Sequence, residues 1–462
     1  MHKIELLLPA GNWDCLKAAV ENGADAVYLG LDKFNARRRA QNFTLENIPK
    51  AIDYCHENGV KVYCTLNILI KNSEVNEFFK SIKQLYLAGI DAVIIQHLSF
   101  LSIIKHNFPG LEVHLSTQAT ITNSYCFELI KKADKIVLPR EFSKEEIQNF
   151  IQKTKLPVEI FIQGAQCFSY SGKCLFSSMI YQRSGNRGLC AQPCRQKYND
   201  SYLLSMKDLC LLNKIPELIQ IGVSSLKVEG RLRSAKYVAA AAKTYRQAID
   251  SYYQNNFTPP IALFKEMELA FNREFTSGYY TCEKEIISSE RPMGRGQYLG
   301  TLEKDNFIEL KEDLALGDGV GIWLKDKVDG ALIKKIESNH LPLKQAKSGE
   351  KVKLFIHAPI GTKIYKTSSL KEAEKITFNK NKPIIKPKRE DKEIILPKIF
   401  PNNSAKEELL IKVYSLRDAQ TALDITEKIP RKVFYNLFAN DFNPRFSAYI
   451  PRILNDQEVE EA

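Results

Sequence analysis

Four cysteines within one short segment are the residues of this chain whose types and spacing best fit chemistry. They lie in residues 159–197, separated by six, fifteen and three residues: Cys167, Cys174, Cys190 and Cys194. Glycines flank them, so the segment can turn back on itself and bring four thiolates to one centre. We call residues 159–197 the cysteine segment, and its pattern predicts a metal site.

Two kinds of metal centre use four thiolates. Zinc sites usually take two cysteine pairs with about two to four residues between partners, and only Cys190 and Cys194 have that spacing. The longer gaps are less typical of zinc, whereas a wider four-thiolate site can hold an iron–sulfur cluster. A radical-SAM triplet would need a third cysteine where Lys197 stands, so that interpretation fails.

Length and composition indicate an ordinary globular protein. The chain has 462 residues, of which 44% are hydrophobic and 26% charged, enough for one large core and smaller domains. The first apolar run ends at Pro9, too short for a secretory signal, and no later run is long enough to cross a membrane. We therefore expect a cytoplasmic protein with no membrane partner. Because thiols stay reduced there, clustered cysteines favour metal over disulfides.

Positive charge is concentrated in two stretches of a chain whose net charge is +12. Residues 161–240 carry eleven Lys and Arg against four Asp and Glu, and residues 361–400 carry eleven against five. A solvated face explains the second stretch. In the cysteine segment, basic and aromatic residues interleave, a mixture that grips phosphates while stacking bases. The candidate RNA-binding residues are Arg183, Arg187, Arg195 and Tyr170, with Phe168, Phe176 and Tyr181 beside them.

Short β-rich runs alternate with segments of helical period over the first 230 residues or so. Helical segments open on Thr44 and Ser143 as expected N-caps. Such alternation predicts an α/β fold, a (β/α)₈ TIM-like barrel. The eight expected strands are 5–8, 26–30, 61–66, 92–96, 112–116, 135–138, 158–162 and 225–229.

Function in such a barrel lies on the loops after the strands, and the cysteine segment follows the seventh strand. In the eighth, alternation places Lys227 and Glu229 opposite Leu226 and Val228, so charged groups would enter the barrel mouth. For each polar residue at the end of another strand, the sequence allows a structural role as well as a chemical one. These residues are Asn67, Gln96, His97, Ser116, Gln118, Arg140 and Arg231.

The chain after the barrel changes character. Residues 1–290 form the expected barrel domain, closed by an alanine-rich helix after Arg231. Short strands broken by Gly and Asp at residues 295–360 predict a small antiparallel β-barrel. A basic, Pro-rich linker at 361–407 then leads to residues 408–462, a strand–helix–strand α/β segment too small to bury itself.

Several motifs together resemble the collagenase-like peptidase family U32. They are LLLPAGNWDCLKAAVENGADAVYLG at the start, HLSTQA at 114–119, LPRE at 138–141, EIFIQGAQCFSYSGKCLFSS at 159–178, RSGNRGLCAQPCR at 183–195, KDLC at 207–210 and SLKVEGR at 225–231. The resemblance covers about residues 3–290. It implies that Cys167, Cys174, Cys190 and Cys194 hold a 4Fe–4S cluster. Cys210, in KDLC, is expected to be a buried thiol, and core packing is expected for the other five cysteines.

The resemblance implies RNA modification more than proteolysis. Members were first labelled peptidases, but relatives use an iron–sulfur centre to hydroxylate RNA bases, with prephenate as oxygen donor. Their targets are C5 of the tRNA wobble uridine or of a 23S rRNA cytidine; other relatives hydroxylate the ubiquinone ring. We expect the tRNA reaction here, with 23S rRNA cytidine hydroxylation and a U32-type protease as alternatives.

A protease would need an activated nucleophile or a metal with a bound water. The sequence contains no HExxH pair and no GxSxG elbow, and His114 falls inside an expected strand. For the hydroxylase, Arg140, Lys227 and Arg231 are candidates to bind the carboxylates of a small anionic donor such as prephenate. With Glu229 they make up the candidate catalytic residues.

Overall fold

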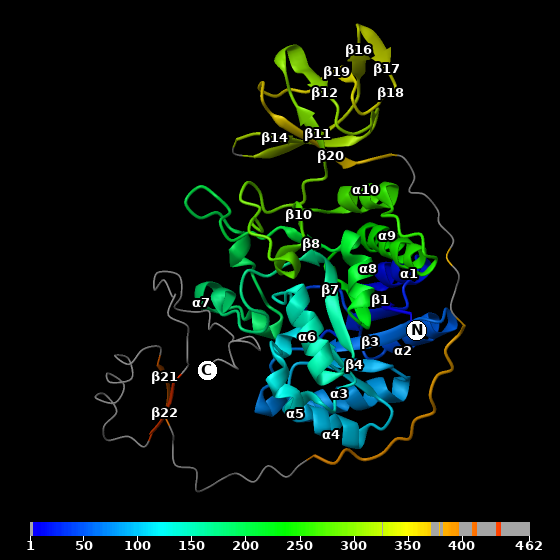
Figure 1. The fold of residues 1–462 in the computed structure, drawn as a ribbon, viewed down its shortest axis with the longest axis vertical. Coiled ribbons are helices and arrows are strands. Elements are labelled where there is room, and N and C mark those ends of the chain that lie inside the picture. Colours follow the sequence, from blue (N-terminus) through cyan, green and yellow to red (C-terminus); the bar gives the residue numbers. More distant parts are fainter. Residues whose placement is uncertain are drawn as a thin grey trace.

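Eight parallel strands form a closed barrel in the computed structural model of the protein, as the sequence predicts (Figure 1). The strand β9 pairs in parallel with both β7 and β1, and this closes the ring. Their side chains are almost all buried, which is typical of parallel strands covered by helices. The strands are β1 (Glu5–Pro9), β2 (Ala26–Gly30), β3 (Lys61–Leu66), β4 (Ala92–Ile95), β5 (Glu112–Leu115), β6 (Lys135–Val137), β7 (Val158–Ala165) and β9 (Ser225–Val228).

The structure describes residues 3–325, 327–370, 378 and 382–396, and the backbone of two strands at 409–413 and 431–435. In this part of the chain, no helix combines the length and the apolar run that a membrane crossing would need.

Helices surround the barrel. They are α1 (Trp13–Glu21), α2 (Ile48–Glu57), α3 (Val75–Ala88), α4 (Ser99–Asn107), α5 (Phe127–Ile130), α6 (Lys144–Thr154), α8 (Ile215–Gln220) and α9 (Ala235–Tyr253). Ser143 caps α6 as predicted, because its side chain accepts a hydrogen bond from the Glu146 amide. The Thr44 prediction is wrong by one turn: α2 is preceded by Asn47, whose amide donates to the Thr44 hydroxyl at 3.3 Å.

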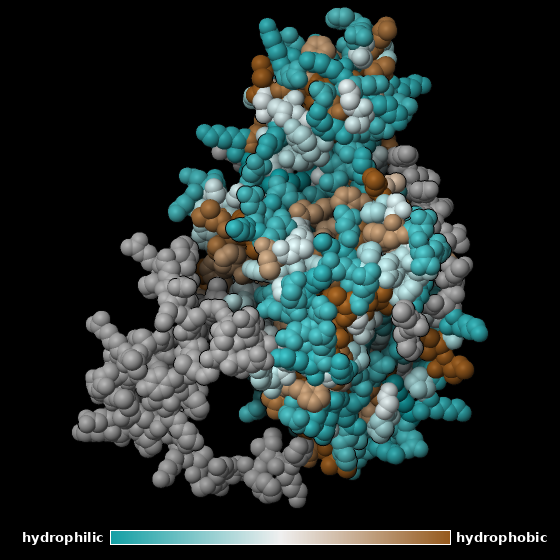
Figure 2. Space-filling model, in the orientation of Figure 1, coloured by the Kyte–Doolittle hydropathy of each residue, from teal (hydrophilic) through white to brown (hydrophobic). Residues whose placement is uncertain are grey.

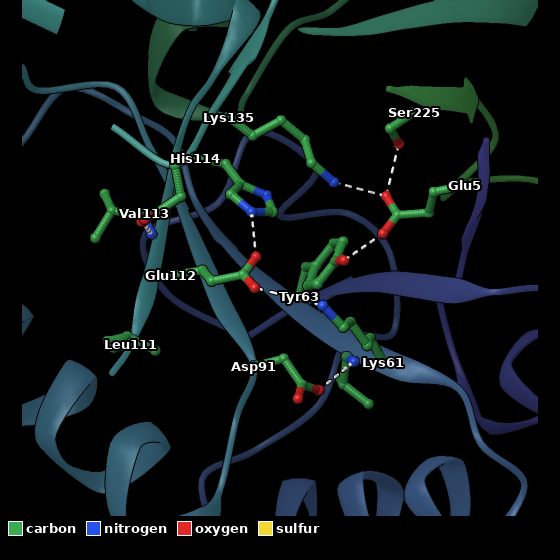
Figure 3. Close-up of polar contacts among 12 residues, drawn as sticks. Glu5, Lys61, Tyr63, Asp91, Leu111, Glu112, Val113, His114, Lys135 and Ser225 are labelled. Atoms are coloured by element: carbon green, nitrogen blue, oxygen red, sulfur yellow. Dashed lines mark hydrogen bonds and ion pairs between the residues drawn. The ribbon is translucent and has the colours of Figure 1, made fainter. Parts of the chain in front are cut away.

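A polar network fills the barrel where the strands begin (Figure 3). The Glu5 carboxylate accepts hydrogen bonds from Lys135 at 2.7 Å and Ser225 at 2.6 Å. Burial would raise the pKa of Glu159, but Lys227 and then Lys135 outweigh it and lower that pKa. We call this network the polar floor; its members are Glu5, Tyr63, His114, Lys135, Glu159, Ser225 and Lys227.

Two short strands extend the barrel beside β7. The strand β8 (Asp208–Cys210) pairs antiparallel with the end of β7, and β10 (Phe275–Thr276) pairs with β8. Arg273 fixes β8, since its guanidinium donates to the buried Asp208 carboxylate at 2.6 Å. The helix α10 (Ile261–Ala270) precedes β10. The strands β8 and β10 therefore adjoin the end of β7 at which the loop with the four cysteines begins.

The second domain consists of antiparallel sheets around a core of its own, above the barrel in Figure 1. One sheet has the order β11-β20-β14-β15 and another β12-β19-β16-β17, while β13 pairs with β18. The bounds are β11 (Gln297–Thr301), β12 (Phe307–Glu309), β13 (Leu314–Ala315), β14 (Gly319–Trp323), β15 (Val328–Leu332), β16 (Ile336–Ser338), β17 (Leu341–Leu343), β18 (Gln345–Ala346), β19 (Lys351–Leu354) and β20 (Lys363–Ser368).

The strand β20 corrects the boundary predicted at residue 360. It lies between β11 and β14 and pairs with both, so the small domain runs at least to Ser368. The stretch 361–407 is therefore not wholly a linker, because its first residues complete a sheet.

Residues 382–396, which we call the strap, follow the outside of the barrel (Figure 1, orange). The Ile384 amide donates to the His56 carbonyl at 2.8 Å, and Arg389 donates to the Tyr86 carbonyl at 2.9 Å. Asn107 exchanges two hydrogen bonds with the Ile395 backbone. The strap thus binds to the barrel instead of running free as the predicted linker would.

The predicted segment 408–462 is described in part. Its strands β21 (Leu409–Val413) and β22 (Arg431–Tyr435) are present and pair in parallel. The helix predicted between them lies outside the described residues.

Candidate functional site

The cysteine segment belongs to a long loop whose two ends are held together. The loop leaves β7 after Ala165 and returns at Asp208, and these two residues are partners in the β7–β8 pairing. The Arg195 guanidinium lies across this base, donating to the Gln166 carbonyl at 3.2 Å and also to the Met206 carbonyl. The loop is therefore closed at its base before any metal is considered.

The middle of the loop is fixed by two other barrel loops. Glu141, after β6, accepts hydrogen bonds from the Ser171 amide at 2.5 Å and its hydroxyl at 3.1 Å. The Thr120 hydroxyl donates to the Ser171 carbonyl at 2.9 Å. Gly172 has a positive φ of 77°, and a Cβ there would lie 2.2 Å from the Gln118 carbonyl oxygen. Only glycine allows this approach between Cys167 and Cys174.

The second half of the loop folds around Ser177 in α7 (Phe176–Tyr181). The Ser177 hydroxyl donates to the Arg183 carbonyl at 2.5 Å and accepts from the Ala191 amide at 2.9 Å. Asn186 donates to the Cys174 carbonyl at 3.3 Å. These bonds tie the regions of Cys174 and Cys190 together.

The four cysteines are near one another but are not drawn into contact. Burial, and then the charges of the other three cysteines, raise the pKa of Cys194 to about 11. Within the described ranges, however, no group of three or more His, Cys, Asp or Glu side chains could close on a single metal ion. A zinc ion would hold four sulfurs about 3.8 Å apart, from Zn–S bonds of about 2.3 Å. Four thiols carried by one loop are the donor set that an iron–sulfur cluster takes.

Two of the predicted RNA contacts are corrected, because their guanidinium groups are bonded within the protein. Arg187 makes two hydrogen bonds to the Glu74 carboxylate, at 2.7 and 2.6 Å, and one to the Leu69 carbonyl. Arg195 closes the base of the loop and is part-buried. Both hold the cysteine segment instead of facing a ligand. Arg183 is half-buried and has no side-chain partner among the described residues, and Tyr170 lies half-buried near Tyr279.

Two arginines converge on Glu229 at the barrel mouth. Its carboxylate accepts from Arg37 at 3.1 Å and from Arg140 at 3.4 Å. Burial would raise the pKa of Glu229, but Arg37 and Arg140 outweigh it and lower that pKa. The Arg140 guanidinium also lies 3.6 Å from the centre of the Phe161 ring.

Arg37 is a site residue that the sequence analysis missed. Glu229 is the main cause of its raised pKa, and the charge of Cys167 adds to it, so Arg37 links the carboxylate to the cysteines. A recognisable signal was present, because three consecutive arginines, 37–39, follow the second strand.

The other two candidate catalytic residues are deeper in the barrel. Lys227 is 4% exposed and donates to Glu159 at 2.6 Å, over the Tyr28 ring. Arg231 is 3% exposed and donates to the Thr65 hydroxyl at 2.8 Å and to the Asn42 side chain. Neither side chain is exposed to solvent: Lys227 is paired with Glu159 of the polar floor, and Arg231 adds positive charge beneath the mouth.

The family follows from the first 290 residues. Residues 11–290 match the family described as Peptidase family U32. The chain belongs to peptidase family U32.

Curated relatives in the U32 family have different printed functions. "Uncharacterized protease MJ0090" of Methanocaldococcus jannaschii is 35% identical over 76% of this chain and 95% of its own length. "tRNA hydroxylation protein P1" of Bacillus subtilis is 35% identical over 60% of this chain and 71% of its own. "23S rRNA 5-hydroxycytidine C2501 synthase" of Escherichia coli is 32% identical over 73% of this chain but only 55% of its own.

Among the described residues, no histidine is paired with a nucleophile as the peptidase label of the U32 family would require. There, no histidine ring is hydrogen-bonded to a serine, threonine or cysteine: His56 contacts Asp91, His97 accepts from the Ile70 amide, and His114 contacts Glu112. His114 is fully buried, and burial lowers its pKa. It is a core residue, as the sequence suggests.

The remaining cysteines of this U32 chain are separate from the four. Cys210 is half-buried and contacts the Tyr245 hydroxyl at 3.7 Å; burial raises its pKa, and the charge of Glu268 adds to the rise. Cys15, Cys55 and Cys64 are buried as predicted, whereas Cys282 is exposed, which corrects its assignment to the core.

Hydrophobic side chains are exposed beside the four cysteines. Phe168 is 38% exposed and Tyr181 37%, while Phe176 stacks on Tyr198. Leu175, Met179 and Ile180 are more exposed still. Figure 2 shows hydrophobic residues gathered near α7 on a face that is otherwise largely hydrophilic. The mouth is therefore bordered by flat and apolar side chains that can stack on bases.

Proposed function

We propose that the protein is an iron–sulfur-dependent RNA hydroxylase that adds a hydroxyl group to C5 of a pyrimidine. The substrate is the wobble uridine of tRNA, and prephenate is the oxygen donor. The observation that carries the proposal is the position of four spaced thiols above a barrel mouth with excess positive charge. Two U32 relatives named for tRNA and 23S rRNA hydroxylation support the reaction class.

Cys167, Cys174, Cys190 and Cys194 would hold the cluster. When bound, it would supply redox chemistry that no protein side chain offers. The protein's part is preorganisation: Arg195, Glu141 and Ser177 hold the loop that carries the thiols.

The mouth has the charge to bind a dianionic donor. At the mouth, Arg37 and Arg140 bond Glu229 and Arg231 lies nearby, while Lys227 is matched by Glu159. The three arginines outnumber the carboxylates there even when Glu141, which interacts with Arg140, is counted with Glu229. Prephenate carries two carboxylates. Arg140 and Arg37 already hydrogen-bond the Glu229 carboxylate, and both would hydrogen-bond a donor carboxylate with charge assistance.

The reaction is a net oxygen insertion. A C–H bond at C5 becomes C–OH, so the base loses two electrons and the donor that gives up the oxygen gains them. To reach the mouth, the pyrimidine must leave its stack, which is easiest in a loop such as the anticodon. Closure of the mouth by the RNA itself would exclude water from the transfer.

The decisive experiment is mass spectrometry of nucleosides from total RNA of strains with and without the gene. We expect one tRNA uridine derivative to lose the mass of one oxygen in the deletion strain. A plasmid encoding Cys174→Ser should fail to restore it, although the variant should still bind RNA. Loss of a 23S rRNA cytidine derivative instead would move the substrate to ribosomal RNA.

Two further results bear on the alternatives. Anaerobically purified protein should contain roughly four iron atoms per chain; stoichiometric zinc without iron would overturn the cluster. Identical nucleoside profiles, together with gelatin cleavage that Cys174→Ser abolishes, would favour the peptidase.

A further inference from the structure

The loop after β2 presents two arginines to solvent. Of the three consecutive arginines, Arg37 turns inward to Glu229. Arg38 and Arg39 are exposed, and neither side chain has a hydrogen-bond or ion-pair partner in the part of the chain that the structure describes. They therefore contribute nothing visible to holding the fold together.

The backbone beneath these arginines is rigidly supported. Asn42 is buried, and its side-chain amide donates to the carbonyls of Arg37 at 3.2 Å and Ala40 at 2.9 Å. The buried Asn35 accepts from the Arg37 amide at 2.7 Å. Arg231 in turn bonds the Asn42 side chain from inside the barrel. The loop is thus built to hold its outer side chains in place.

The loop also touches the cysteine segment. Gly188 has a positive φ of 77°, and a Cβ there would lie 2.3 Å from the Asn35 carbonyl oxygen and 2.9 Å from Cγ of Arg38. Because Gly188 comes two residues before Cys190, their Cα atoms are at most about 7 Å apart. Arg38 therefore lies over the segment that carries the thiols.

We propose that Arg38 and Arg39 bind the phosphates that flank the nucleotide whose base enters the barrel mouth. A base that leaves its stack keeps its own two phosphates at the rim, each with one negative charge. The rim must supply cations there, and the arginines that the sequence favoured for this, Arg187 and Arg195, are bonded inward. This inference rests on the proposed function in that the ligand is RNA and one of its bases enters the barrel mouth.

The test is RNA binding by the full-length holoenzyme and its Arg38→Gln/Arg39→Gln variant, as a function of salt. The probes are total tRNA and 23S rRNA, and the RNA that the wild type binds more tightly is used for the salt titration. Each lost phosphate contact should lower the slope of log affinity against log salt by about 0.7–0.9, hence by roughly 1.5 for two. At about 0.15 M salt this corresponds to roughly tenfold weaker binding. Iron content and the unfolding midpoint should not change.

A matched control removes the same charge elsewhere. Lys382 and Lys388 are exposed lysines of the strap with no partner among the described residues. The strap binds near the C-terminal ends of α2 and α3, at the end of the barrel opposite the mouth. Lys382→Gln/Lys388→Gln should therefore bind RNA with nearly the wild-type slope.

Three outcomes would overturn the inference: a wild-type slope in the arginine variant, an equal loss in the lysine control, or no RNA binding by the wild type. The outcome of this test is independent of the outcome of the nucleoside test of the proposed function. If the arginine variant loses slope while nucleosides do not depend on the gene, the phosphate contact stands and the hydroxylase falls.

Discussion

At the floor of the barrel, two carboxylates, Glu5 and Glu159, face two lysines, Lys135 and Lys227, and every one of these charges is matched. At the mouth, Arg37 and Arg140 share the carboxylate of Glu229, and the buried Arg231 adds a further positive charge nearby. Both ends bury charge in the same barrel, but only the floor neutralises it internally. In such barrels, the end where strands start serves stability and the end where they finish serves chemistry. Charge balance therefore distinguishes the two roles.

The largest expected effect is at the floor. Glu159→Gln leaves Lys227 buried without its anionic partner and should lower the free energy of unfolding by about 3–5 kcal/mol. Glu229→Gln should cost less, because Glu229 is itself 11% exposed and Arg37 31% exposed, whereas Glu159 is fully buried; of the freed groups, only Arg140, 8% exposed, stays buried. Denaturant unfolding of both variants measures the difference. Equal losses of unfolding free energy would contradict the distinction between the floor and the mouth.

At the mouth, we expect Arg140→Gln to weaken the binding of prephenate by roughly 10- to 100-fold. That equals about 1.5–3 kcal/mol for a hydrogen bond to a charged group. Lys61→Gln, a half-exposed lysine at the floor end, is the control and should leave the affinity unchanged. Calorimetric titration measures both. An unaltered affinity in a folded Arg140→Gln protein would mean that the surplus charge serves something else.

The base of the cysteine loop allows a sharper test of Arg195. Arg195→Lys cannot reach both carbonyls, and a buried carbonyl without a partner costs about 1–3 kcal/mol. We expect less iron per chain after purification and a lower unfolding midpoint, with the salt dependence of RNA binding preserved. A reduced salt slope with full iron content would instead restore Arg195 as a phosphate contact.

The smallest effect is expected from the Arg187–Glu74 pair. Hydrogen bonds from Arg187 lower the pKa of Glu74 from its usual 4.5 to about 2. The pair therefore contributes stability above pH 4.5 that is lost as the pH falls toward 2. The difference in unfolding midpoint between wild type and Glu74→Gln should be constant near neutrality and shrink over that acidic range. A difference that persists at pH 2 would show that packing, not charge, is responsible.

The fold could be predicted from the sequence because strand period and buried runs are local signals. All eight barrel strands coincide with the apolar runs from which the sequence analysis predicted them. The Thr44 error is local too, since Thr and Asn both favour N-caps; Pro49, within the first turn, marks Asn47 as the nearer cap. The strand β20 was missed because its basic residues hid a strand that pairs in the middle of a sheet.

The site was predictable only as a set of residue types. The four cysteines are recognisable from their spacing, but the partner of an arginine depends on the tertiary structure. Nothing in the sequence shows that Arg187 meets Glu74, 113 residues away. Arg37 could have been proposed from its place after a strand, while its contact with Glu229 could not.

The strap shows what part of the chain's basic charge does. Arg389 binds a carbonyl at the end of α3, and the strap backbone binds another at the end of α2, where Lys386 pairs with Asp53 nearby. Helix C-termini carry partial negative charge, and a cation there is worth about 0.3–1 kcal/mol at low ionic strength. Added salt screens this interaction, and it also weakens RNA binding because it reduces the gain from counterion release. A salt titration therefore weakens two interactions at once: the binding of the strap at one end of the barrel and the binding of RNA at the other.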